Sequence, residues 1–88
     1  MKVEFRNSFA KDLKSIRDKS LLERLRETIE ETERAKSPSE ISNLKKLKGG
    51  GDYYRIRIGD YRIGIVFAEG ALVFVRFLNR KDIYKYFP

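Results

Sequence analysis

Basic residues alternate with apolar ones on both sides of the pair Gly59-Asp60. Alternation with a period of two is typical of a strand that buries one face, and a two-residue loop with glycine first suits a type II′ hairpin turn. Counting outward from that turn places three arginines on one face, beside a glycine without a side chain: Arg55, Arg57, Arg62 and Gly64. Guanidinium groups gathered in this way can grip phosphate oxygens, so the pattern predicts a phosphate-binding face.

The same strand pairing sets two positive charges against each other, because Arg57 lies directly opposite Arg62. Like charges at opposed positions destabilise a sheet, and an anion bound between them would relieve that cost. The other face of the predicted hairpin is apolar: Tyr54, Ile56, Ile58, Tyr61, Ile63 and Ile65. A solvated outer face that merely carries three arginines is the alternative interpretation.

A second hairpin follows, and its register decides where Arg76 points. A three-residue loop, Ala68-Glu69-Gly70, fits a type I turn followed by a bulge and pairs Arg62 with Arg76. A two-residue Glu69-Gly70 loop would direct Arg76 into the core, where an unpaired charge is costly. We therefore expect the three-residue loop, with Arg76 on the same face as the other arginines.

Further basic residues lie in the segment that precedes the hairpins. Residues 39–52 form a connection in which Ile41, Leu44 and Leu47 are spaced by three, as in one or two helical turns. Its lysines lead into the run Gly49-Gly50-Gly51: Lys45, Lys46 and Lys48. This run lacks the spaced glycines and the Lys-Ser/Thr pair of a nucleotide-binding loop, so we expect a flexible basic loop.

The C-terminal segment is expected to finish the last strand and continue as a short helical or extended tail. It returns Lys81, Lys85 and two tyrosines, Tyr84 and Tyr86, to the neighbourhood of the arginines. From the residues alone, Tyr84 is either a functional side chain or one that packs the tail against the sheet.

An N-terminal strand and a helix are the first of the elements that must support this face. Val3 and Phe5 alternate with charged residues as in a strand, and Asn7 or Ser8 can cap the helix that follows. The apolar residues of that helix recur at helical spacing: Phe9, Leu13 and Ile16.

A second helix is expected to begin at Ser20, because Ser20 and Glu23 have the spacing of a capping box, and to end at Ser37-Pro38. Its apolar stripe is Leu22, Leu25 and Ile29. Its other face is charged and is interpreted as solvated: Arg24, Glu27, Glu30, Glu31 and Arg34. The pattern predicts an α+β fold in which two N-terminal helices, joined by a turn at Asp18–Lys19, pack on one face of a four-stranded, mainly antiparallel sheet.

Composition limits the chemistry further. The 88 residues suit one domain, 1–88, and they include neither cysteine nor histidine, so no disulfide, thiolate nucleophile, zinc site or histidine base is expected. No apolar run is long enough to span a membrane, and the N-terminus does not read as a signal peptide, so a cytoplasmic protein is expected. Residues 1–43 have a net charge of +1 and residues 44–88 of +6. Such a basic half attracts phosphate backbones, and an anionic membrane surface is the weaker alternative.

Three motifs together resemble the RelE side of the RelE/ParE toxin superfamily: Leu47-Lys48-Gly49, the block Tyr54–Arg62, and Arg80-Lys81-Asp82-Ile83-Tyr84. The resemblance spans essentially the whole chain, and the ending Tyr86-Phe87-Pro88 is most similar to archaeal and cyanobacterial members. It implies a type II toxin that cuts mRNA on the ribosome, by attack of the RNA's own 2′-hydroxyl, with no metal or cofactor. The implied partners are the ribosome, mRNA and a cognate antitoxin with an acidic helical segment.

The resemblance also assigns roles to individual residues. Arg62 corresponds to the arginine that stabilises the charged phosphorane, and Arg80 to one that protonates the leaving group or stabilises the phosphate. Tyr84 corresponds to the tyrosine proposed as general base and stacking platform, while Arg55 and Arg57 match basic positions that hold RNA and assist proton transfer. The other basic residues are expected to bind RNA: Lys45, Lys46, Lys48, Arg76, Lys81 and Lys85.

Two departures from the family pattern bear on the acid–base chemistry. Arg55 and Arg57 stand where the best-studied members carry lysine, and arginine is a poor base because it stays charged. Asn79 stands where many relatives carry histidine. Activity is therefore expected to be weaker, or its acid–base assignment different. The alternatives are a ParE-like gyrase poison, a noncatalytic RNA- or DNA-binding module, and a decayed toxin that only binds its antitoxin.

Overall fold

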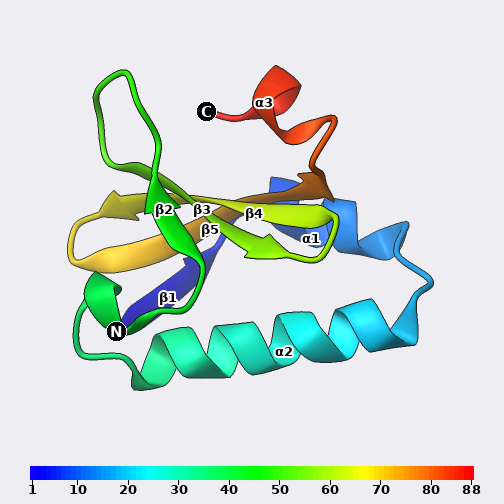
Figure 1. The fold of residues 1–88 in the computed structure, drawn as a ribbon, viewed down its shortest axis with the longest axis horizontal. Coiled ribbons are helices and arrows are strands. Elements are labelled where there is room, and N and C mark those ends of the chain that lie inside the picture. Colours follow the sequence, from blue (N-terminus) through cyan, green and yellow to red (C-terminus); the bar gives the residue numbers. More distant parts are fainter.

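A five-stranded sheet forms the centre of the structure, a computed structural model that describes residues 1–88 (Figure 1). Its strands are β1 (Lys2–Phe5), β2 (Leu44–Lys46), β3 (Tyr53–Ile58), β4 (Tyr61–Ala68) and β5 (Ala71–Asn79). The helices are α1 (Asn7–Lys14), α2 (Lys19–Arg34), a 3-10 turn at Pro38–Glu40, and α3 (Ile83–Tyr86). In space the strands follow the order β1-β5-β4-β3-β2, and only β1 and β5 pair in parallel.

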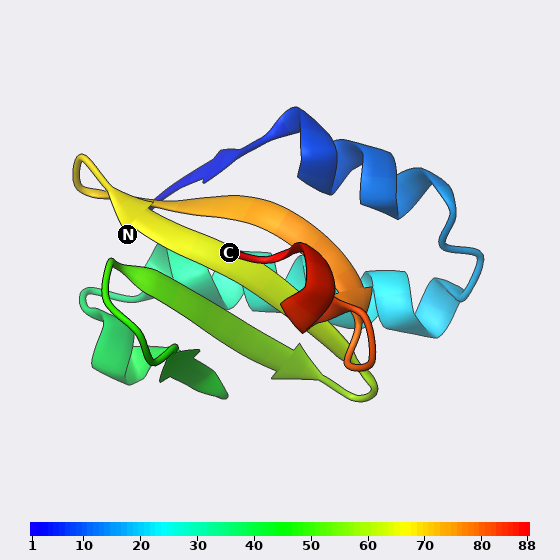
Figure 2. The ribbon, with the colours of Figure 1, turned by 90° about the horizontal axis from the view of Figure 1, so that it is seen from above.

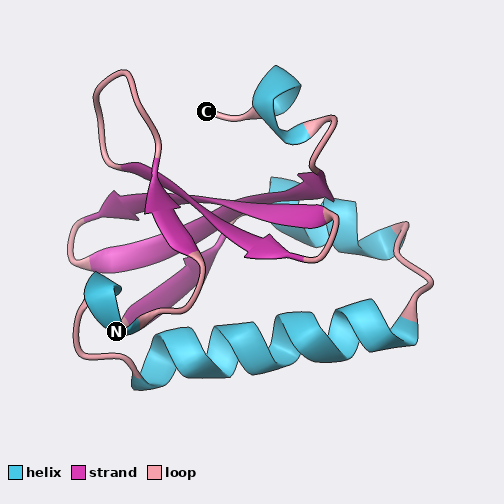
Figure 3. Ribbon diagram, in the orientation of Figure 1, coloured by secondary structure: helices cyan, strands magenta, loops and turns pink.

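The sheet separates two layers, because α2 runs beneath it and the short α3 lies above it (Figures 1 and 3). Seen from above, β1 and α1 lie beside β5 at one edge and β2 lies at the other (Figure 2). The α+β fold is confirmed, but the sheet has five strands rather than four. The extra strand is β2, which lies in the segment 39–52 that we expected to be a connection without a strand. Leu44, Lys45 and Lys46 pair with β3 instead. The helical turn near this segment is Pro38–Glu40, which precedes Ile41.

The hydrophobic core lies between the sheet and the two N-terminal helices. Its largest fully buried side chains come from the inner strands: Phe74, Phe77, Ile56, Ile63 and Ile65. Burial of each such side chain contributes about 1.5–3 kcal/mol. From the helices, Phe9, Leu21 and Leu25 join this cluster. The stripe of α2 is therefore rotated from the predicted one, since Leu21 is buried and Leu22 only half-buried.

The first hairpin has the predicted register. Ile58 pairs with Tyr61, and Arg57 pairs with Arg62. Gly59 has a φ of 56°, a left-handed value that the first position of a type II′ turn requires.

The second hairpin differs from the prediction. Its turn contains only Glu69-Gly70, and a bulge between Gly64 and Ile65 then shifts the register. As a result Arg76 pairs with Gly64, whereas Arg62 pairs with Leu78. The bulge removes the objection to a two-residue turn, because it returns Arg76 to the side of the sheet away from the core.

Both helix starts also differ from the expected caps. Neither Asn7 nor Ser8 caps α1; the Ser8 hydroxyl donates instead to the carbonyl of Val75 at 2.6 Å. Helix α2 begins at Lys19, one residue before the expected Ser20, because the carboxylate of Asp18 accepts the N–H of Leu21 at 3.1 Å. A carboxylate at a helix N-terminus also interacts favourably with the helix dipole.

Candidate functional site

Three arginines share the face of the sheet opposite the buried isoleucines. Arg55 and Arg57 alternate along β3 with Ile56 and Ile58, which are 1% and 3% exposed. Arg62 lies directly across from Arg57 on β4. The pairing therefore confirms that Arg55, Arg57 and Arg62 lie on one face, hereafter the arginine face.

Arg62 has the most perturbed environment of the three. Its Nη1 donates to the carbonyl oxygens of Gly59 at 2.8 Å and Tyr61 at 2.9 Å. Partial burial lowers the pKa of the Arg62 guanidinium, and the positive charges of Arg55 and Arg57 lower it further. A cation held among other cations is a preformed receptor for negative charge.

A hollow of about 140 Å³ lies beside β2 at one end of the arginine face. Its lining comes from β2, the loop after it, β3 and α3: Lys45, Lys46, Leu47, Lys48, Arg55 and Tyr84. Lys45 lies directly opposite Arg55 in the β2–β3 pair. The fold thus gathers the predicted lysines, one arginine and the predicted tyrosine around one site, hereafter the tyrosine hollow.

The C-terminal tail is fixed by the residues on either side of Tyr84. Ile83 is fully buried and Phe87 is 3% exposed, whereas Tyr84 is 59% exposed. The ring of Phe87 lies directly over Gly64 and meets Tyr53 edge to face at 5.7 Å. The space that Gly64 leaves beside the arginines, because it has no side chain, is therefore filled by Phe87 and is not open to a phosphate.

Arg80 lies at the turn that follows β5, next to the first hairpin. Its backbone N–H donates to the carbonyl of Asp60 at 2.7 Å, and its Nε lies 3.9 Å from the Asp60 carboxylate. The Asn79 side chain accepts the N–H of Lys81 at 3.0 Å and so stabilises this turn. Lys81 and Lys85 are exposed, and the ammonium group of Lys85 lies 3.7 Å from Asp82.

Arg76 is placed differently from the other arginines. It is on the same side of the sheet as Gly64 and lies 5.5 Å from the ring of Tyr86. Its Nε and Nη2 donate to the Asp12 carboxylate at 2.8 Å and 3.0 Å, and this pair raises the pKa of Arg76. The expected pairing with Arg62 is therefore wrong, and Arg76 ties α1 to β5.

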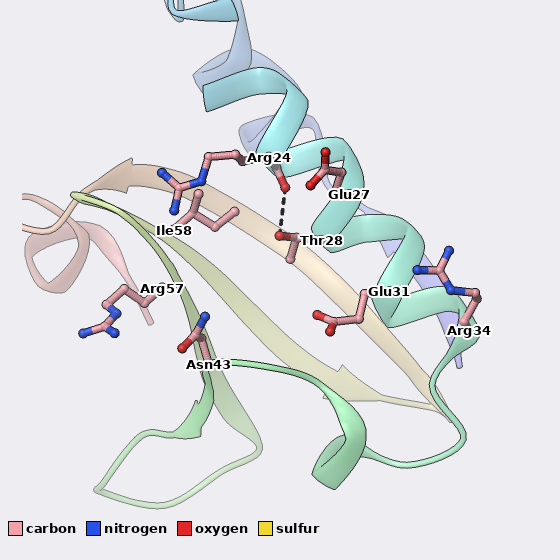
Figure 4. Close-up of a pocket in the computed structure, with 8 residues that line it drawn as sticks. All are labelled: Arg24, Glu27, Thr28, Glu31, Arg34, Asn43, Arg57 and Ile58. Carbon is pink, nitrogen blue, oxygen red and sulfur yellow. Dashed lines mark hydrogen bonds between the residues drawn. The ribbon is translucent and has the colours of Figure 1, made fainter. Parts of the chain in front are cut away.

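A second hollow, of about 420 Å³, lies at the first hairpin turn and is called the turn hollow below. Its lining combines predicted arginines with one from α2: Arg24, Asn43, Arg57, Gly59, Asp60, Arg62 and Arg80. It adjoins a further hollow between α2 and β3 (Figure 4). Sequence reasoning missed Arg24, because helical spacing places it on a charged face and gives no sign that this face meets the turn.

Two absences complete the description of the surface. No cluster of three or more acidic, histidine or cysteine side chains is arranged to hold a metal ion. None of the helices has both the length and the apolar character needed to cross a bilayer.

Comparison with known proteins identifies the family. Residues 3–84 match the family model described as ParE toxin of type II toxin-antitoxin system, parDE. The chain is 44% identical to Toxin RelE3 of Methanocaldococcus jannaschii over the full length of both proteins.

Solved structures support the same family assignment. The toxin of the RelB-RelE antitoxin-toxin complex from Methanococcus jannaschii matches with a TM-score of 0.79 and 41% identity, covering 97% of this chain and 99% of that one. The archaeal RelE-RelB complex from Pyrococcus horikoshii OT3 matches with a TM-score of 0.71 and 27% identity, covering 93% and 97%. The chain therefore belongs to the RelE/ParE superfamily and is a RelE-like toxin of a type II toxin–antitoxin system.

Proposed function

We propose that this toxin is an RNA endonuclease that cleaves mRNA on the ribosome in the cytoplasm. The observation that carries the proposal is that five predicted side chains line two hollows, each of which includes residues of the arginine face: Arg55, Arg57, Arg62, Arg80 and Tyr84. These side chains can position a phosphate, stabilise charge that develops on it and move a proton, which are the needs of an internal phosphoryl transfer.

In the proposed step, the 2′-oxygen of a ribose attacks its own 3′-phosphate while Tyr84, as the tyrosinate, accepts the 2′-hydroxyl proton. The bond from phosphorus to the 5′-oxygen of the next nucleotide breaks, and that oxygen takes a proton from solvent. The products are a 2′,3′-cyclic phosphate and a 5′-hydroxyl. Arg62 contacts the phosphate oxygens, and Arg80 stabilises the leaving oxygen. No metal ion takes part.

The remaining basic residues divide into two groups in this proposal. Five lysines would hold the RNA backbone or ribosomal RNA: Lys45, Lys46, Lys48, Lys81 and Lys85. Arg76 is assigned to the structure instead, because its charge is already satisfied by Asp12.

We also infer that a cognate antitoxin restrains this toxin. The two archaeal relatives above were solved as complexes of RelE with RelB. A partner of this chain would need an acidic segment to match the +6 charge of residues 44–88.

The test is primer extension on mRNA translated by purified ribosomes, with wild-type protein and Arg62→Ala. We expect discrete cuts with the wild type and a rate lower by about 10²–10³-fold with the variant, as for loss of one oxyanion donor. Gyrase poisoning is the second candidate, because the matching family model is described as a ParE toxin. Inhibition of DNA supercoiling by gyrase, with mRNA left intact, would replace the proposal by that candidate.

A further inference from the structure

We propose that Arg24 of α2 binds a second RNA phosphate, adjacent to the scissile one, in the turn hollow. This inference rests on the proposed RNA cleavage. It assigns a ligand contact to a helix face that the sequence alone marks as solvated.

The turn hollow exists because β2 is short. Pairing between β2 and β3 ends at Leu44 and Ile56, and beyond that point only the N–H of Arg57 reaches back, to the carbonyl of Asn43 at 3.4 Å. The rest of β3 is an outer edge of the sheet. Around this edge, side chains from α2 below the sheet can meet side chains from the arginine face above it.

Arg24 is the α2 residue that reaches this edge. Its Nη1 lies 3.1 Å from the position that a Cβ of Gly59 would occupy, so the guanidinium lies against the hairpin turn. Figure 4 shows its side chain extending from the helix toward the strand that carries Ile58 and Arg57. The absence of a side chain at Gly59 permits this close approach.

The charge of Arg24 is free to meet a ligand. None of the five ion pairs in the structure includes Arg24, Arg57 or Arg62. Glu31, which lies on the same helix face, accepts a hydrogen bond from the Ser42 hydroxyl at 2.9 Å.

The balance of charge in the turn hollow favours an anion. Four arginines and one carboxylate line it, and that carboxylate, Asp60, already lies 3.9 Å from the Nε of Arg80. A volume of about 420 Å³ also leaves room beyond a single phosphate at Arg62.

The two hollows define a path for an RNA strand. Arg55 lines the tyrosine hollow and Arg57 lines the turn hollow, and two residues along a strand span about 6.7 Å. This spacing is close to the step between successive phosphates of an extended strand. Arg24 and Arg62 line the same turn hollow, so a strand with its scissile phosphate at Arg62 can place the neighbouring phosphate against Arg24.

The test combines Arg24→Gln with mRNAs in which one phosphate near the cleavage site is replaced by a neutral methylphosphonate. Arg34→Gln is the matched control, because it removes the same charge from the same helix ten residues away, about 15 Å along the axis. We expect Arg24→Gln to lower kcat/KM for cleavage roughly three- to tenfold and Arg34→Gln to change it less than twofold.

The neutral substitutions then locate the contact. With wild-type toxin, one phosphate next to the scissile one should show a similar loss when neutralised, and Arg24→Gln should no longer sense that substitution. Equal effects of Arg24→Gln and Arg34→Gln, or undiminished sensitivity to the substitution in Arg24→Gln, would overturn the assignment. Wild-type protein that does not cut mRNA would instead refute the proposed function itself, so the two failures are distinguishable.

Discussion

The ring of Phe87 lies where a side chain on Gly64 would begin. A Cβ built on Gly64 would be 2.6 Å from the Cγ of Phe87 and under 3 Å from two further ring carbons. Tyr84 belongs to the short α3, whose first residue, Ile83, is buried, and Phe87 follows directly after this helix. The absence of a side chain at Gly64 therefore lets the tail dock and sets the position of Tyr84.

Replacement of Gly64 by alanine should release this tail. The added methyl cannot share its position with the Phe87 ring, and overpacking of this kind costs about 1–3 kcal/mol. We expect Gly64→Ala to keep the sheet but to lose order in α3 and to cut mRNA more slowly. Amide hydrogen exchange of residues 83–87, beside circular dichroism of the whole protein, measures the two effects separately.

A double-mutant cycle provides the control for this prediction. In a Phe87→Ala background the clash is gone, so Gly64→Ala should have little additional effect on stability. Additive losses in the double variant would contradict the steric explanation.

Asp12 should contribute strongly to the free energy of unfolding, because it joins α1 to β5. Its carboxylate accepts two hydrogen bonds from Arg76 and one from the N–H of Phe77 at 2.9 Å. Because the Arg76 side chain is only 25% exposed, removal of Asp12 leaves a poorly solvated charge, and we expect Asp12→Ala to cost about 2–4 kcal/mol. Urea denaturation measures this loss. The exposed pair of Glu23 and Arg26 is the control, since Glu23→Ala should cost no more than about 1 kcal/mol.

Local periodicity was sufficient to predict the arginine face. Alternation around Gly59-Asp60 specified the pairing of Arg57 with Arg62, because a two-residue turn leaves one register once the buried face is known. The second hairpin could not be predicted in this way. Its register depends on the bulge between Gly64 and Ile65 as well as on the length of the turn, and the isolated glycine in the strand is the one local signal for that bulge.

Contacts between segments that are far apart in the chain could not be predicted from the sequence either. Nothing near Asp12 indicates that it pairs with a residue 64 positions later. Likewise, the sequence predicts that the charged face of α2 is solvated. It does not show that β2 is too short to cover the edge of β3, which leaves that edge open to α2. Arg24 gains its place in the turn hollow from that tertiary arrangement.

Loss of Arg62 should stabilise the fold even as it removes activity. Burial and neighbouring cations lower the pKa of Arg62, so the charged form is disfavoured in the folded state and its removal at pH 7 relieves repulsion. We expect Arg62→Ala to gain about 0.2–1 kcal/mol at low salt, a rise in Tm of roughly 1–6 °C. The gain should shrink in 1 M salt, which screens exposed charges. A lower Tm at every salt concentration would show that the hydrogen bonds of Arg62 to the turn outweigh the repulsion.

Binding of an acidic antitoxin should depend on salt without being abolished by it. Residues 44–88 carry a net charge of +6, so screening weakens the attraction, whereas burial of apolar surface persists at high salt. Titration calorimetry between 0.1 M and 1 M salt should show a weaker but measurable complex. Complete dissociation in high salt would indicate a purely electrostatic, nonspecific association.

Two substitutions of Tyr84 should separate proton transfer from base stacking. The ring is 59% exposed at the end of the arginine face, where it can contact a base, and the hydroxyl can reach an RNA backbone held by Arg55 and the β2 lysines. Tyr84→Phe keeps the ring and should reduce the cleavage step by about 10²–10⁴-fold with little change in binding. Tyr84→Ala should also weaken binding, by about 1–3 kcal/mol for one stacked base.

Lys48→Ala, in the same hollow, should affect mainly binding and its salt dependence. Single-turnover cleavage on programmed ribosomes, at several toxin concentrations, resolves rate from affinity. If Tyr84→Phe cleaves like the wild type while Tyr84→Ala is inactive, Tyr84 is a stacking platform and another group accepts the 2′-hydroxyl proton.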